Sequence, residues 1–197
     1  MAVSTNDPNA LDNLKSEAIP VSNKSSTDKN TLVFVKEGSG DFYKFSNFLD
    51  RFSISFPANL ASSVDNDDFG VILTKQAEFF DESGKMVASP SAEMLLKPKM
   101  ALAVRVVDAT EVQTQLISWE DTIIDSFREF YDLPPQFGDI SFSENFYRGV
   151  KIRYANFPHA DKSIDYTIIT AKNGNDYLVI ANSREQIFSI VDKLLGF

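Results

Sequence analysis

The chain has 197 residues, a net charge of −9 and no cysteine, which excludes disulfide bonds, thiolate metal sites and thiol nucleophiles. The acidic excess argues against binding to nucleic acid or to anionic lipid, because both need clustered Lys and Arg. No apolar run of about 18 residues is present, so no direct membrane insertion is predicted, and the 17 Phe residues predict a substantial core.

Residues 1–30 are rich in Asn, Ser, Asp, Lys and Thr, with scattered apolar side chains. Such a segment cannot bury enough surface to offset its ordering entropy, so a flexible tail or linker is predicted. The segment also lacks the apolar centre of a signal peptide. Residues 31–197 are predicted to form a single α+β domain.

The first half of this domain reads mainly as short strands. The segment Phe52–Phe56 alternates apolar and polar residues, which is typical of a strand with one buried face, and Pro57 ends it. Residues 81–85 read as a hairpin turn, and residues 88–99 as a loop with two prolines. The other predicted strands are 32–36, 42–45, 71–74, 77–80 and 100–107.

A helix is predicted from about Trp119 to Tyr131, with Ser118 and Asp121 as a weak capping box. Large apolar side chains recur on one side of it, and Leu133-Pro134-Pro135 ends it.

The last third of the chain carries the clearest pattern. Strands are predicted at 140–142, 147–154, 164–171 and 177–182, with a type I′ turn at Asn173-Gly174. A helix begins after Ser183, with Gln186 as the return half of a capping box and Gly196 as the C-terminal cap. Two amphipathic helices and about eight hairpin-linked strands predict an α+β fold in which helices pack on the faces of a mostly antiparallel sheet.

Two segments together resemble the PsbP-like family, named for the extrinsic protein of photosystem II. The first is the strand-like Phe52–Pro57 followed by the bulky Leu60. The second is the Tyr147–Tyr154 segment with the later hairpin, the helix after Ser183 and Phe197. The chain departs from the family in its Met86–Lys99 insertion and in having Leu60 where Trp is frequent.

This resemblance implies an α/β/α sandwich, which the family shares with a Ran-binding nuclear import factor and with bacterial lipoproteins. It also implies a non-enzymatic accessory or protein-binding role, tethered by an N-terminal linker. The location implied is extracytoplasmic or in an organelle lumen if a targeting segment has been removed, and cytoplasmic otherwise.

Only weak candidates for metal ligands are present in the sequence. Asp65 and Asp67 lie in an acidic stretch, but Phe69 and Gln76 occupy positions where a calcium-binding EF-hand loop needs oxygen ligands. His159 and Asp161 supply two ligands where zinc sites use three or four. No metal and no cofactor are therefore predicted.

Three basic residues, Arg148, Lys151 and Arg153, lie on or near one predicted strand and are candidates for partner contact, with cross-strand charge pairing as the alternative. Asp121, Asp125 and Glu129 form one helical line, which favours a solvated face over a hydrolytic pair of carboxylates. The chain has one His and neither a nucleophile elbow nor a phosphate-binding loop, so no catalytic residues are predicted.

We therefore expect a protein-binding module whose partner is a basic protein or a membrane complex. The alternatives are a small-ligand carrier with an aromatic-lined cavity and, less favoured, a hydrolase that uses acidic residues.

Overall fold

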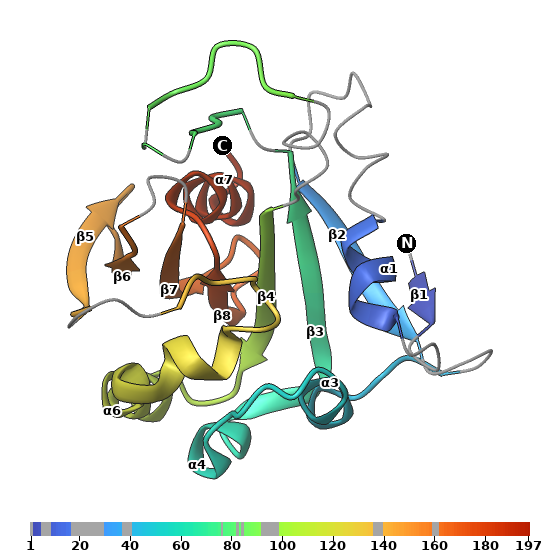
Figure 1. Cartoon of the computed structure of the whole chain (residues 1–197). Helices are drawn as coiled ribbons and strands as arrows, with labels where there is room; N and C mark the ends of the chain where they lie inside the picture. The colour runs from blue at the N-terminus through green and yellow to red at the C-terminus, as the bar shows by residue number, and fades with distance from the viewer. Residues whose placement is uncertain are drawn as a thin grey trace.

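The computed structural model describes residues 2–4, 9–16, 30–36, 41–75, 77–81, 83, 85–91, 99–135, 140–158 and 162–197. Within these residues one eight-stranded sheet forms the centre of the molecule, and helices cover both of its faces (Figure 1). The predicted α+β sandwich with a mostly antiparallel sheet is confirmed.

The strands follow the spatial order β1-β2-β3-β4-β8-β7-β6-β5. All neighbouring pairs are antiparallel except β1 and β2, which run parallel. The strands are β1 (Ala2–Ser4), β2 (Asn30–Lys36), β3 (Val64–Thr74), β4 (Lys99–Val106), β5 (Ser143–Tyr147), β6 (Val150–Asn156), β7 (Ser163–Thr170) and β8 (Asp176–Ala181).

The helices divide between the two faces of the sheet. On one face lies α7, where Ile187, Ile190 and Val191 form a small core with β4, β6, β7 and β8. On the other face a larger and more aromatic core lies beneath the remaining helices (Figure 1). These helices are α1 (Ala10–Ser16), α3 (Phe45–Arg51), α4 (Ala58–Ala61) and α6 (Ala109–Phe127), whereas α7 spans Arg184–Leu195.

Strand alternation decides which side chains reach which core. On β2, Val33 and Val35 are buried in the larger core, so Leu32 and Phe34 project toward the α7 face. The same alternation on β4 sends Leu102 to the larger core and Ala101 to the smaller one. The α7 face of β2, however, has little cover, and both Leu32 and Phe34 are exposed.

The region around α3 differs from the prediction. The expected strands at 42–45 and 52–56 are wrong, because α3 begins at Phe45 and residues 53–57 are irregular. The side chains at Phe45, Phe48 and Phe52 are buried in an aromatic cluster, so the apolar spacing reflects a helix face and its exit. The strand expected at 77–80 is reduced to one bridge between Phe80 and Met86.

Two strands extend over segments in which no strand was predicted. The acidic stretch at 65–70 belongs to β3, which begins at Val64 and has an irregular register between Val64 and Phe69. The short strand predicted at 140–142 is absent, and β5 occupies 143–147 instead. This half of β3 was not predicted because its sequence is rich in carboxylates. In the structure these carboxylates lie beside basic residues of the sheet, not in a loop.

The long helix α6 begins ten residues before its predicted start. Asp108 is its N-cap and accepts hydrogen bonds from the backbone N–H groups of Thr110 and Glu111, at 3.1 and 3.0 Å. The capping box at Ser118 is therefore wrong. The predicted apolar side of this region is confirmed, because Trp119, Ile123 and Phe127 are buried.

The type I′ turn is also misplaced. At 171–175, Gly174 has a φ of 83° and its N–H bonds to the Ala171 carbonyl, whereas Asn173 has a negative φ. This is a three-residue hairpin with glycine in the left-handed position. Two consecutive positive φ angles occur instead in the β5–β6 turn, at Arg148 (53°) and Gly149 (79°).

Both ends of α7 are as predicted. The Ser183 hydroxyl accepts from the Gln186 N–H, and Gly196 ends the helix with a φ of 82°. The reciprocal half of the capping box is wrong, because the Gln186 side chain donates to the Ile72 carbonyl and the Thr74 hydroxyl on β3, each at 3.0 Å. This residue therefore ties α7 to the sheet instead of closing its own helix.

The N-terminal stretch departs from the expected flexible tail where the structure describes it. Residues 2–4 pair with β2, and α1 buries Ala10 and Leu14 in the larger core. Ala10 and Leu14 are spaced by one helical turn and therefore lie on the same side of this short helix, facing the core. The polar composition of the segment as a whole did not indicate this contact.

Candidate functional site

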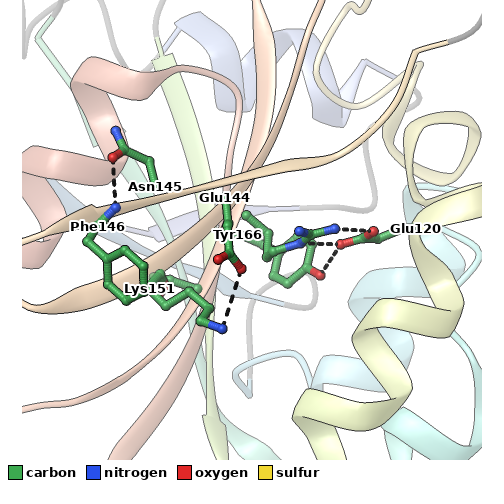
Figure 2. A network of polar contacts seen from close by, with 8 residues as sticks. Glu120, Glu144, Asn145, Phe146, Lys151 and Tyr166 are labelled. Atoms are coloured by element: carbon green, nitrogen blue, oxygen red, sulfur yellow. Dashed lines mark hydrogen bonds and ion pairs between the residues drawn. The ribbon is translucent and has the colours of Figure 1, made fainter.

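The three basic residues predicted to contact a partner each form an ion pair within the chain. Arg148 contacts Asp192 at 2.9 Å, Lys151 contacts Glu144 at 3.4 Å, and Arg153 contacts Glu120 at 2.7 Å. Figure 2 shows the Lys151–Glu144 pair and, beside it, Glu120 reaching from α6 toward the sheet. The alternative, cross-strand charge pairing, describes Lys151, whose partner lies on β5. Arg148 and Arg153 pair with helices instead, through Asp192 of α7 and Glu120 of α6.

The contact between α6 and the sheet is a network centred on Glu120. The Arg153 guanidinium donates to both carboxylate oxygens, at 2.8 and 2.7 Å, and the Tyr166 hydroxyl donates to one of them at 2.5 Å (Figure 2). The hydrogen bonds with Glu120 raise the pKa of Arg153, and burial raises the pKa of Tyr166. Three hydrogen bonds to one carboxylate thus hold α6 against β6 and β7.

The metal candidates are not brought together in the described part of the chain. Asp65 pairs with Arg105 at 3.4 Å, and Asp67 pairs with Lys44 at 3.7 Å. His159 and Asp161 lie outside the described residues. Among the described residues no group of three or more His, Asp and Glu side chains could hold a metal ion.

A buried polar group that no sequence pattern indicated lies beneath the start of α7. Ser163 donates a hydrogen bond to the carboxylate of Asp165, and these two residues are only 5% and 2% exposed. Burial raises the pKa of Asp165 to about 7, against the opposing charges of Lys99 and Arg184. A substrate cannot reach this group in the folded protein, so we interpret it as structural.

A wide polar hollow of about 820 Å³ runs along the outer side of α7. Several of the residues that line it contact other parts of the chain. The Tyr147 ring stacks on Phe188 at 4.1 Å, and its hydroxyl donates to Asp192, while Glu185 accepts from backbone N–H groups of the 77–78 segment. This hollow therefore has the features of a surface depression stabilised by its own contacts.

A smaller and mostly apolar groove of about 330 Å³ lies on the other side of α7. Its floor is the sheet, where Gly70 on β3 stands directly opposite Ala103 on β4. One bank consists of Leu32 and Phe34 from β2. The second bank is formed by Ile190 and Leu194 from α7, and Tyr177 of β8 also lines the groove.

Gly70 keeps this floor low. A Cβ atom built there would lie 2.6 Å from the Leu32 Cδ1 atom, so the glycine lets Leu32 lie flat across β3. Since that contact involves only the end of a flexible side chain, an alanine would displace Leu32 rather than disturb the backbone. The groove depth thus depends on two small residues, Gly70 and Ala103.

The apolar surface continues past Phe34. The ring of Phe34 packs edge-on against Phe42 with 5.8 Å between centroids, and a second hollow of about 210 Å³ opens beside them. Asp67 and Asp68 line this end of the surface, where Arg105 reaches Asp65 and Asp68 and Lys44 reaches Asp67. Three carboxylates share two cations here, so this end carries a negative excess.

Sequence reasoning did not identify the groove. The segment Leu32–Val35 is apolar at each position, which is typical of a strand buried on both faces. The absence of alternation was therefore the available signal, but it could not distinguish a covered face from an open one.

Comparison with known proteins adds no assignment. A scan against protein-family models and searches of curated proteins and of solved structures found no match for this chain. Among the described residues, no helix is both long and apolar enough to cross a membrane.

Proposed function

We propose that this protein is a non-enzymatic accessory module that binds another protein through the apolar groove beside α7. The observation that carries the proposal is the continuous exposed apolar surface of Leu32, Phe34 and Phe42 leading into that groove. Exposed apolar patches of this kind mark interaction sites. A role of this type is also what the resemblance to PsbP-like proteins implies.

The charge of the chain supports a basic partner. The net charge is −9, and the Phe42 end of the groove carries an excess of carboxylates. A field of this sign accelerates the approach of a positively charged surface, whereas the apolar contact determines how long the complex lasts. The partner expected is a protein with apolar side chains flanked by Lys or Arg.

A small-ligand carrier is the second candidate. The groove volume of about 330 Å³ lies at the lower end of the range of roughly 300–1,000 Å³ that small-molecule sites occupy. It is lined by sheet and helix on three sides but remains open to solvent through the β2 bank, where Leu32 and Phe34 are exposed. An open bank of this kind favours a polypeptide partner over an enclosed ligand.

The first prediction concerns capture of the partner from an extract of the source organism. Leu32→Ser should abolish retention of a protein that wild type retains, because it replaces an apolar side chain of the β2 bank with a polar one. Ile117→Ser is the matched control, since Ile117 is a comparably exposed apolar residue on α6, on the opposite side of the sheet. Quantitative mass spectrometry of the retained proteins is the measurement.

The same partner should associate more slowly as salt rises, with a smaller change in its dissociation rate, because the Debye length falls from about 10 Å at 0.1 M to about 3 Å at 1 M.

Equal loss of the partner in both serine variants would contradict the proposal. An association rate independent of salt would contradict the proposal that charge attracts the partner.

A further inference from the structure

On its own face, α7 covers only part of the sheet. It packs on β7, β8 and β4. Farther along the same face, Leu32 and Phe34 on β2 are 45% and 43% exposed. On the opposite face, by contrast, Val33 and Val35 of the same strand are buried with Leu14 of α1. α7 reaches this half of the face at one end only, where Gln186 bonds to Thr74 of β3 and Ser189 accepts from Asn30 of β2. Among the described residues, the part around Leu32 and Phe34 has no helical cover.

A second helix packed beside α7 would be centred over β3. Packed helices lie about 8–10 Å apart, and neighbouring strands about 4.8 Å apart. A helix beside α7, which is centred near β8, would therefore lie two strands away, over β3. Gly70 of β3 and its register partner Ala103 of β4 form the floor at this position.

The side chains at this position form a groove of the shape into which a helix can pack. Small residues in the floor allow close approach, and larger side chains stand on both banks, Leu32 and Phe34 on one side and Ile190 and Leu194 on the other. An extended strand would instead need an open row of backbone groups, but β3 is hydrogen-bonded on both sides, to β2 and to β4.

We propose that the occupant of this groove is a basic amphipathic α-helix of the partner protein, which lies alongside α7 as a second helix on the sheet. This inference rests on the proposed function and specifies its partner. The apolar face of the helix contacts Ala103, the Leu32 side chain that lies over Gly70, and the α7 bank. Its Lys or Arg residues face the Phe42 end, where Asp65, Asp67 and Asp68 outnumber Arg105 and Lys44.

The test uses a synthetic peptide of about 18 residues, long enough to form a helix, with Leu at i, i+3, i+4 and i+7 positions and Lys elsewhere. A peptide of the same composition in scrambled order is the control for charge. Binding to the full chain is followed by fluorescence anisotropy. Only the ordered peptide should bind, and circular dichroism should show that its helicity rises in the complex.

Two variants locate the binding. Ala103→Leu fills the floor and should weaken peptide binding by about tenfold or more, the scale expected for a central apolar contact. Ala61→Leu makes the same change on an exposed position of α4 and should bind the peptide like wild type. Thermal unfolding of both variants checks that the fold is intact, and Gly70→Ala provides a second groove variant if Ala103→Leu is unstable.

Other outcomes would overturn the inference. Equal binding of the scrambled peptide would mean that charge alone attracts it, and equal binding by Ala103→Leu would place the peptide elsewhere. Competition by dodecanoate at the groove would favour a small apolar ligand, and concentration-dependent sedimentation lost in Ala103→Leu would favour a second copy of the chain. If the peptide fails while Leu32→Ser still abolishes partner capture, the binding function stands and the helical occupant is rejected.

Discussion

Replacing Phe48 by alanine should lower the free energy of unfolding by about 3–5 kcal/mol, the cost of removing a buried Phe from a packed core. Phe48 is completely buried on α3, and its ring lies 4.7 Å from Phe52, 5.3 Å from Phe69 and 5.7 Å from Phe130, between centroids. The loss combines the transfer of the ring to solvent, the cavity that remains and the lost aromatic contacts.

The matched control is Phe146→Ala on β5, where the side chain is 59% exposed. We expect that change to cost less than about 0.5 kcal/mol, as is usual at surface positions. Chemical denaturation of both variants measures the difference. If Phe48→Ala costs no more than Phe146→Ala, α3 does not pack on the sheet and the aromatic core described here is wrong.

The second large effect is a dependence of stability on pH that Asp165→Asn should remove. Asp165 is buried on β7, where Ser163 donates to it, Lys99 of β4 and Arg184 of α7 are the nearest cations, and Tyr154 of β6 stands opposite it in register. Desolvation of the charged form outweighs both cations and raises the pKa of this carboxyl from 3.8 to about 7.

The sign follows from proton linkage. Between pH 4 and 7 the folded protein retains a proton on Asp165 that the unfolded chain has released, so this group stabilises the fold most at acidic pH. Its contribution is lost as pH rises through 7. Since each pKa unit corresponds to about 1.4 kcal/mol, the loss between pH 5 and 8 amounts to about 2–3 kcal/mol.

Urea denaturation at pH 5, 6, 7 and 8 measures this slope. Asp165→Asn should unfold with a flatter profile and should exceed wild type in stability at pH 8, because the amide carries no charge to bury. Asp121→Asn, on the exposed side of α6, serves as the control and should leave the wild-type slope unchanged. A wild-type profile that rises from pH 5 to 8 and is unaltered in Asp165→Asn would contradict the account of this group.

Elements defined by local signals were predicted well. For α7, the hydroxyl of Ser183, the apolar spacing from Ile187 and the left-handed Gly196 act within a few residues of one another, so the sequence alone indicates both ends. β4 and β8 were likewise recognisable from mostly apolar runs, which are typical of strands buried on both faces.

Elements that depend on distant partners were predicted poorly. The N-terminal half of β3 carries exposed carboxylates, and it is held in the sheet beside Arg105 of β4, some 40 positions away in the chain. Phe45 and Phe48 are three residues apart, a spacing that places both on one face of a short helix, and both pack in the aromatic cluster beneath α3. The two-residue turn with both φ angles positive lies at Arg148-Gly149. The pairing of Tyr147 with Val150 set its length, rather than the composition of the turn.

The candidate site could not have been predicted. Strand alternation placed Lys151 and Arg153 on one face, as expected, but their partners Glu144 and Glu120 come from β5 and α6. The groove exists because α7 lies mainly over β7, β8 and β4 and touches β2 and β3 at one end only, which is a property of helix placement rather than of any motif. Leu32 and Phe34 became candidates only once that placement was known.

The central claim, that the groove beside α7 contacts a protein partner, is tested most directly by site-specific photo-crosslinking in an extract of the source organism. A benzophenone side chain is introduced at Phe34 in the groove or, as a control, at Phe146 on β5. The account predicts one discrete crosslinked protein at position 34, none at position 146, and loss of the product when Ala103→Leu fills the groove. The same product at both positions, or a product at position 34 that Ala103→Leu leaves unchanged, would contradict it.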